Sequence, residues 1–193
     1  RRPGSKELGE AARNRGTWVH TQIEAWLHSH SMGAQHPPAT HFTFGSYWRT
    51  SRPWFEQHWI HTVAIERVTY HPLRFSGTFD AIGYTDHSPL PTLFDWKTAR
   101  NTRDDYIIHD YTLQLAAYRL GIQHTYGVKL ERAMLVIARP TTAPDTYEFD
   151  AAQLDAAEAA FKARLNAYYA LPTEETSVSN TPTNEETHQS AEE

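Results

Sequence analysis

Four charged residues in the middle of the chain fall on segments whose apolar pattern predicts β-strands. They are Glu66, Asp80, Asp95 and Lys97. Side chains alternate between the two faces of a strand. Asp95 and Lys97 therefore point to one face of the segment LFDWKT, and the aromatic residues beside them point to the other. Buried acids are unfavourable unless they are paired or bind a metal ion, so the pattern indicates a site.

Acids on neighbouring strands can share one cation, because adjacent strands lie about 4.8 Å apart. Hard oxygen ligands select Mg²⁺ or Mn²⁺. Such an ion lowers the pKa of a bound water, orients that water and stabilises charge on a phosphoryl oxygen. A nearby lysine can hold the water or offset charge on the phosphate. These residue types, at this spacing, therefore suit the hydrolysis of a phosphodiester.

The elements that must position these residues follow from hydrophobic periodicity. The predicted helices span residues 5–30, 46–60, 110–127 and 150–170. The predicted strands span residues 62–70, 74–84, 92–98 and 132–140, with a hairpin turn over 85–91. We expect Pro53 near the start of the second helix, Asp110 as the N-cap of the third and Gly127 at its end. The order predicts an α/β fold with a mixed central sheet flanked by helices on both faces.

Composition bounds the domain organisation and the partners. Residues 1–171 are enough for one domain, and the Glu-rich residues 172–193 are expected to form a disordered acidic tail. The net charge is −5, but without the six tail glutamates 17 acids face 18 bases, which permits a DNA-binding face. Cysteine is absent, which excludes disulfides, thiolate zinc sites and Cys-ligated iron–sulfur clusters.

Five motifs resemble those of the PD-(D/E)XK nucleases, and in particular of RecB-like exonucleases. They are RGTWVHTQIEAWL (15–27, similar to G-x-x-x-H-x-x-I-E), ERV (66–68), GTFD (77–80), DWK (95–97) and QLAAY (114–118, similar to Q-x-x-x-Y). They occur in family order across more than half of the chain. DWKT after the G-x-x-D hairpin most resembles the mitochondrial genome maintenance exonuclease and its bacterial and phage relatives. The resemblance implies a PD-(D/E)XK, restriction-endonuclease-like core.

The resemblance also implies a set of metal ligands. Asp80 and Asp95 would bind Mg²⁺ or Mn²⁺, joined by the carbonyl oxygen of Trp96. His20 would supply an imidazole to the same ion or to a second one. No iron–sulfur cluster is expected. Gly16, which interrupts the first helix, would allow a close approach of that helix to a strand or to the substrate.

Further roles carry over to the residues around those ligands. Lys97 would position or activate the attacking water, and Glu66 would orient water or support a second metal ion. Gln114 and Tyr118 would line the site. The near-neutral body favours a narrow, locally basic DNA channel over a broad duplex-binding face. The candidate channel residues are Arg49, Arg52, Arg100 and Arg103.

The function that the resemblance implies is a metal-dependent DNA exonuclease acting on single-stranded or frayed ends in replication, recombination or repair. Two alternatives stay open: a structure-selective or restriction-type endonuclease on the same core, and a non-catalytic DNA-binding module. No helicase motif is visible, so unwinding would need a helicase or recombination partner. No apolar run reaches the ~20 residues of a membrane span. We expect no membrane partner and a cytoplasmic bacterial or phage protein, with a mitochondrial location left open.

Structural interpretations of the same residues also stay open. His20 could be a surface histidine, Asp80 could support the following turn, and Glu66 could pair with Arg67 or Arg74. Asp95 and Lys97 could form an ion pair on a solvated edge strand. The other two features with an ordinary reading are the Gln114–Tyr118 pair, as part of an amphipathic helix, and the aromatic segment 42–59, as core packing rather than a base-stacking surface.

Overall fold

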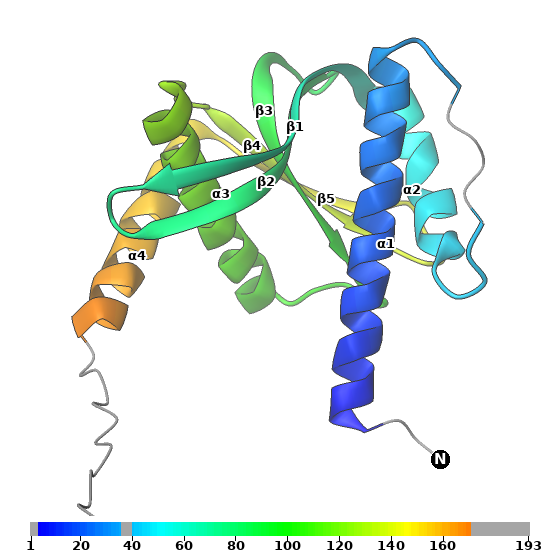
Figure 1. Cartoon of the computed structure of the whole chain (residues 1–193), viewed down its shortest axis with the longest axis horizontal. Helices are drawn as coiled ribbons and strands as arrows, with labels where there is room; N and C mark the ends of the chain where they lie inside the picture. Colours follow the sequence, from blue (N-terminus) through cyan, green and yellow to red (C-terminus); the bar gives the residue numbers. More distant parts are fainter. Residues whose placement is uncertain (1–3, 36–39, 171–193) are drawn as a thin grey trace, which may run out of the picture.

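The computed structural model describes residues 4–35 and 40–170, which form a five-stranded sheet and four helices (Figure 1). The helices are α1 (Ser5–Ser31), α2 (Gly45–His58), α3 (Asp105–Tyr126) and α4 (Ala151–Ala170). The strands are β1 (Trp59–His71), β2 (Phe75–Thr85), β3 (Ser88–Thr98), β4 (Arg132–Ala138) and β5 (Asp145–Phe149). The expected acidic tail lies outside the described residues. Within the described ranges, no helix is long and apolar enough to cross a bilayer.

The strand order in the sheet is β1-β2-β3-β4-β5. β3 and β4 are parallel, because α3 connects them, and the other neighbouring strands are antiparallel. This confirms the predicted mixed sheet with a meander of three strands. β5 was not predicted: it is a short edge strand in which Phe149 alone is buried, so its position depends on hydrogen bonds to β4 rather than on an apolar run.

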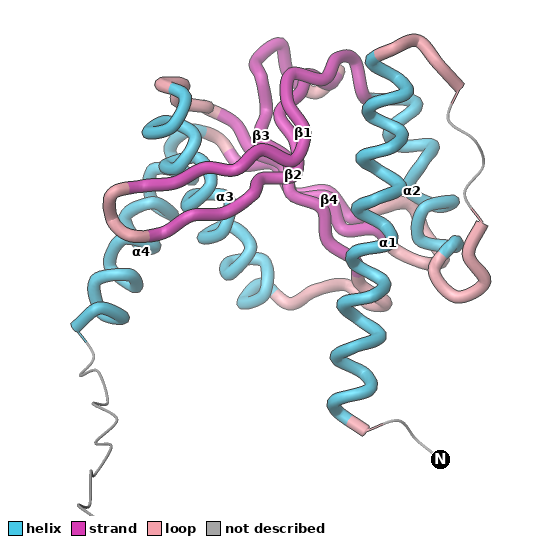
Figure 2. Tube along the Cα trace, in the orientation of Figure 1, coloured by secondary structure: helices cyan, strands magenta, loops and turns pink. Residues whose placement is uncertain are grey.

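The helices form two layers around the sheet. α1 and α2 lie together on one side, and α3 and α4 lie on the other (Figure 2). Phe94 and Trp96 of β3 are buried with α1 and α2, whereas Leu93 is buried with α3 and α4. The aromatic residues Tyr47 and Phe55 of α2 are also buried, so most of the aromatic segment packs in the core. The alternation predicted for the segment LFDWKT is therefore correct.

Three local predictions need correction. Pro53 lies inside α2 rather than near its start. α3 begins at Asp105, after an N-cap at Asp104, and Asp110 instead accepts a hydrogen bond from Arg164 Nη1 at 2.9 Å. The β2–β3 turn is shorter than residues 85–91, because Thr85 and Ser88 already pair. The predicted end of the third helix is confirmed, since Gly127 caps α3 with φ of 72°.

Candidate active site

Three acids lie side by side on neighbouring strands. Ile65 pairs with Ala81 and Arg67 with Phe79, so the position between them sets Glu66 beside Asp80. Ala81 pairs with Phe94, and the next step along both strands sets Asp80 beside Asp95. The acids thus meet at one level of β1, β2 and β3, as a shared cation site requires.

β2 and β3 part at this level. In the described pairings, β3 continues beyond Phe94 with β4 as its partner. On the edge of β3 that faces β2, the main-chain groups of Trp96 therefore form hydrogen bonds with side chains. Asp80 Oδ2 accepts a hydrogen bond from Trp96 N at 2.6 Å, and the Trp96 carbonyl accepts one from His20 Nε2 at 2.8 Å. These two bonds replace sheet hydrogen bonds and place both side chains beside the Trp96 carbonyl oxygen.

His20 is a partly buried residue of the site rather than a surface histidine. Its Nε2 must carry the hydrogen donated to Trp96, because a carbonyl oxygen only accepts. Its Nδ1 lies 3.5 Å from Asp80 Oδ1. Burial lowers the pKa of His20, with a further contribution from Lys97. A neutral imidazole with a free Nδ1 lone pair is the form that can bind a metal ion.

Asp95 lies deep in the sheet and forms an ion pair with Lys97. Its side chain is 1% exposed, and its Oδ2 lies 2.5 Å from Lys97 Nζ. Lys97 Nζ also lies 5.3 Å from the centre of the Tyr111 ring. Among the described residues, Asp95 Oδ1 has no hydrogen-bond partner although it is buried. The ion pair is real, but β3 is flanked by β2 and β4, so the solvated-edge interpretation is wrong.

The pKa values show that the site is short of positive charge. Burial raises the pKa of Asp80 well above its usual value, and the neighbouring Asp95 raises it further. Burial also raises the pKa of Asp95, although Lys97 opposes that shift. Desolvation and a like charge both disfavour the carboxylate form. A cation placed between these acids would remove that penalty.

Glu66 differs from the two aspartates because it is exposed to solvent. Partial desolvation and the nearby Glu24 raise its pKa. Its φ is 46°, in the left-handed region that few residues other than glycine adopt, at a cost of roughly 1 kcal/mol or more. Within the described part of the chain, no ion pair joins Glu66 to Arg67 or Arg74. The strain coincides with the level at which the acids meet.

Tyr118 and Gln114 of α3 approach the acids from the opposite layer to His20. Burial raises the pKa of Tyr118 to about 12, with further contributions from Asp95 and Asp80. Its hydroxyl therefore stays protonated, and it accepts a hydrogen bond from Gln114 Nε2 at 2.8 Å. Its own hydrogen remains available to a carboxylate. Gly77 makes room for the ring, since an added Cβ would lie 2.8 Å from Tyr118 Cε1.

The prediction that Gly16 allows a close approach of α1 to a strand is wrong. The alternative, a close approach to the substrate, stays a prediction. No atom lies within 4 Å of a Cβ built at this position, so no strand approaches it closely. Gly16 instead lines an open depression of about 450 Å³ in front of the acids. The depression is lined by Gly16, Thr17, His20, Thr21, Glu24 and Glu66.

The expected channel arginines fall into two groups. Arg49 and Arg52 lie on α2 and line a separate depression of about 620 Å³, so the fold does not bring them to the acids. Arg52 Nε is paired with Glu56 Oε1 at 2.7 Å. Arg100 and Arg103 lie in the loop directly after β3, close in the chain to Lys97.

Three neighbours of the site were given no role from the sequence, although Glu24 is the last residue of the G-x-x-x-H-x-x-I-E motif. Glu24 lines the depression one helical turn after His20. Tyr111 lies under the Lys97 ammonium group, and Arg15 Nε donates to Thr98 Oγ1 at 3.0 Å, at the end of β3. Spacing was the available signal for two of them. Residues four apart share a helix face, which links Glu24 to His20, and Tyr111 lies three positions before Gln114.

The donor set fits a divalent cation. His20, Glu66 and Asp80 each offer a ligand atom, and these atoms lie within 4.8 Å of one another. The Trp96 carbonyl oxygen lies beside His20 and adds a further ligand atom. Asp95 lies outside that group of three, but its buried Oδ1 has no hydrogen-bond partner among the described residues. A set dominated by oxygen with one imidazole suits Mg²⁺ or Mn²⁺.

Comparison with known proteins identifies the class to which this fold and site belong. The sequence model of the PD-(D/E)XK nuclease superfamily matches residues 39–188, which include Glu66, Asp80, Asp95 and Lys97. The match covers well over half of the chain, and the chain belongs to this superfamily. A search among curated proteins gives no match.

One similar solved structure supports the same fold. A crystal structure from Eubacterium rectale, described as a "putative exonuclease", has a TM-score of 0.53 and 12% identity, covering 80% of this chain. The chain spans 66% of that protein. The crystal structure of SSO0001 has a TM-score of 0.34 and 20% identity, over 52% of this chain and 50% of that one.

Proposed function

We propose that this chain is a Mg²⁺- or Mn²⁺-dependent DNA exonuclease that hydrolyses phosphodiester bonds at single-stranded or frayed ends. The observation that carries the proposal is the level arrangement of Glu66, Asp80 and Asp95 across three strands. These acids adjoin the Trp96 carbonyl and His20 at a fork in the sheet. Nuclease activity is what membership of the superfamily implies. The metal ion, the substrate and the mode of attack are proposals.

A bound Mg²⁺ or Mn²⁺ would supply a water of lowered pKa and offset negative charge on the phosphate. Asp80, Asp95, His20 and the Trp96 carbonyl would hold it. Glu66, facing solvent beside Asp80, would accept a hydrogen bond from water in the open depression and so orient that water.

Lys97 would act from the floor of the site. Its ammonium group contacts Asp95 and lies near the Tyr111 ring, which limits the directions in which it can point. It can donate a hydrogen bond to the attacking water or to a phosphate oxygen. Tyr118 keeps its proton at neutral pH, and its hydroxyl would donate a hydrogen bond to one of the carboxylates, holding that carboxylate in place.

Three considerations support an exonuclease acting on DNA ends. The motifs most resemble those of the mitochondrial genome maintenance exonuclease and its relatives, and the Eubacterium rectale structure carries an exonuclease description. The depression in front of the acids is open on the solvent side and small, at about 450 Å³. Arg15, Arg100 and Arg103 cluster near the end of β3, where they would contact the phosphates of a strand entering the site. A role in replication, recombination or repair belongs to the same proposal.

The test uses the purified chain with Mg²⁺, Mn²⁺ or EDTA. The substrates are 5′- and 3′-labelled single strands, blunt duplexes and covalently closed single-stranded circles. We expect metal-dependent digestion of linear strands, intact circles and no turnover by Asp95→Asn. Linear strands that stay intact with both metals would overturn the enzymatic proposal, leaving a DNA-binding module. Cleavage of circles would replace the exonuclease by an endonuclease on the same core.

A further inference from the structure

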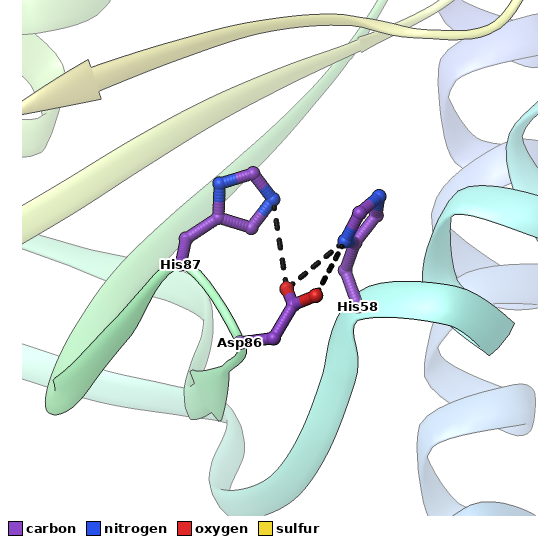
Figure 3. A group of neighbouring side chains, drawn as sticks. All are labelled: His58, Asp86 and His87. Atoms are coloured by element: carbon purple, nitrogen blue, oxygen red, sulfur yellow. Dashed lines mark hydrogen bonds and ion pairs between the residues drawn. The ribbon is translucent and has the colours of Figure 1, made fainter.

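A second group of possible ligands lies on another part of the molecule. His58 is the last residue of α2, and Asp86 and His87 form the turn between β2 and β3. Figure 3 shows the three side chains pointing toward one another, with the Asp86 carboxylate between the two imidazoles. Their ligand atoms lie within 4.8 Å of one another.

The distances within this group suit one small ion. His58 Nδ1 lies 2.9 Å from Asp86 Oδ1, and His87 Nε2 lies 3.7 Å from the same oxygen. Ligands bound to a tetrahedral zinc ion at 2.0–2.1 Å are about 3.3 Å apart. The two observed separations lie on either side of that value, so small side-chain rotations would bring both to it. On binding zinc, His58 Nδ1 would give up the hydrogen that it now shares with Asp86.

The orientation of His87 is set by a further carboxylate. Its Nδ1 donates to Glu148 Oε1 at 2.9 Å, and Glu148 Oε2 is held by Arg132 Nη2 at 2.5 Å. A hydrogen on Nδ1 leaves the Nε2 lone pair free and aimed at Asp86. A carboxylate that holds the far nitrogen of a metal-binding histidine is the usual outer partner in zinc sites.

The surroundings of the group also favour a cation. His58 lies at the C-terminal end of α2, where the helix dipole is negative. The Trp54 ring lies beside both imidazoles, with centroid distances of 5.4 Å to His58 and 6.2 Å to His87, and so shields one side of the group. Asp86 N also donates to the His58 carbonyl at 3.0 Å, so the main chain already holds the turn against the helix end.

We propose that His58, Asp86 and His87 form a Zn²⁺ site, with Glu148 orienting His87 and a water in the fourth position. Two imidazoles and one carboxylate favour zinc over the hard ions that suit the oxygen-rich acidic site. The zinc ion would clamp the end of α2 to the β2–β3 turn. Trp59, which follows His58 in the chain, packs against Phe94 with ring centroids 4.7 Å apart. The zinc ion would therefore also support β3, the strand that carries Asp95.

The test measures zinc directly and does not use DNA, so it is independent of the proposed nuclease activity. The full chain carrying Asp80→Asn, which weakens the acidic site, is dialysed against Zn²⁺ with excess Mg²⁺, and bound zinc is counted by mass spectrometry. We expect one zinc per chain, and a rise in melting temperature on adding Zn²⁺. Adding His87→Gln should remove both, and adding Glu148→Gln should weaken zinc binding by about 10–100-fold.

The matched control is His71→Gln in the same background. His71 also lies beside another histidine, His124, at 5.4 Å between ring centroids, but these two belong to no group of metal ligands in the described part of the chain. The His71→Gln variant should keep the bound zinc. Asp86→Asn serves as a second test variant if His87→Gln does not fold, because the main-chain bond to His58 survives it. The proposal is overturned if Asp80→Asn binds no zinc, or if His87→Gln or Asp86→Asn binds as much.

Discussion

Two charged clusters among the described residues differ in how their charge is balanced. The acidic cluster consists of Glu66, Asp80 and Asp95 with His20 and Lys97. The Arg119 cluster lies between α3 and α4, where Arg119 is fully buried and its Nη1 binds Asp155 at 2.8 Å and Glu158 at 2.7 Å. Arg119 Nε also donates to the Leu130 carbonyl.

The pKa shifts in the two clusters have opposite signs. Hydrogen bonds from Arg119 and Lys129 lower the pKa of Asp155, so its charged form is favoured. Burial and Asp95 raise the pKa of Asp80, so its charged form is disfavoured. The Arg119 cluster holds its own counter-charge and stabilises the fold. In the acidic cluster three acids outnumber Lys97, so this cluster is suited to take up a cation. Three predictions test this difference, from the largest expected effect to the smallest.

The first prediction concerns the only ammonium group that contacts Asp95 in the described structure. Lys97→Met should lower the rate of DNA hydrolysis by about 10³-fold, because in the proposed mechanism it would remove a hydrogen-bond donor to the reacting phosphate or water. Mn²⁺ and DNA binding should persist, since the acids remain. Steady-state digestion and metal titration measure the two effects. Lys129→Met, which removes a cation from the Arg119 cluster, should leave hydrolysis intact. Equal loss of metal binding in Lys97→Met would mean that Lys97 is structural.

The second prediction concerns Arg119. Arg119→Met leaves Glu158, 8% exposed, without its cation, and should lower the free energy of unfolding by about 3–5 kcal/mol. At about 2–4 °C per kcal/mol, the melting temperature should fall by roughly 10 °C. Arg164→Met is the control, because Arg164 pairs with Asp110 across the same two helices on the exposed surface. A similar fall in melting temperature in both variants would show that burial does not determine how much an ion pair stabilises the protein.

The third prediction concerns the sign of the Asp80 effect in metal-free protein. A raised pKa stabilises the fold below the ordinary pKa of aspartate, and that stability is lost as pH rises through the raised value. Asp80→Asn should therefore stabilise the protein in EDTA at neutral pH, where the buried carboxylate is disfavoured. The amide that this substitution introduces can still accept the hydrogen bond from Trp96 N and can donate one to His20 Nδ1.

Thermal melts in EDTA across a pH series measure this effect. The gain in stability from Asp80→Asn should vanish in acid. At neutral pH, Mn²⁺ should no longer stabilise the Asp80→Asn variant. Asp155→Asn is the counterpart, because a lowered pKa stabilises the fold above the ordinary aspartate value. That variant should lose stability at neutral pH and approach the unmodified protein in acid. If Asp80→Asn lowers stability in EDTA at neutral pH, the proposed difference between Asp80 and Asp155 is wrong.

Much of the fold was predictable because its elements have clear local signals. The alternation in LFDWKT correctly separated Asp95 and Lys97 from the two aromatic residues packed behind them. β5 was not predictable in the same way, since only Phe149 is buried and its hydrogen bonds to β4 determine the strand. Arg49 and Arg52 were grouped with the site by residue type, yet α2 carries them to a different depression.

The level arrangement of the acids shows most clearly where prediction from the sequence stops. The pairing of Thr85 with Ser88 at the turn, continued without interruption, would set Asp80 opposite Leu93. A register shift between Gly83 and Thr85 moves Asp80 to the level of Asp95. Gly83 is required there, because an added Cβ would lie 2.4 Å from Trp59 Cζ2 and 2.8 Å from the His61 carbonyl oxygen. Register is a property of how the strands pack, and a glycine such as Gly83 permits a bulge without showing how far the pairing shifts.

The sequence by itself therefore determined which residues could do chemistry, the strands that carry them and the superfamily that their order resembles. Residue type, alternation and motif order are properties of the sequence, and they can be identified without knowledge of the fold. The tertiary structure decided that Glu66, Asp80 and Asp95 are level, and that Asp80 and His20 close the fork at Trp96. Those facts depend on strand register and on the packing of α1 against the sheet, which only long-range contacts determine.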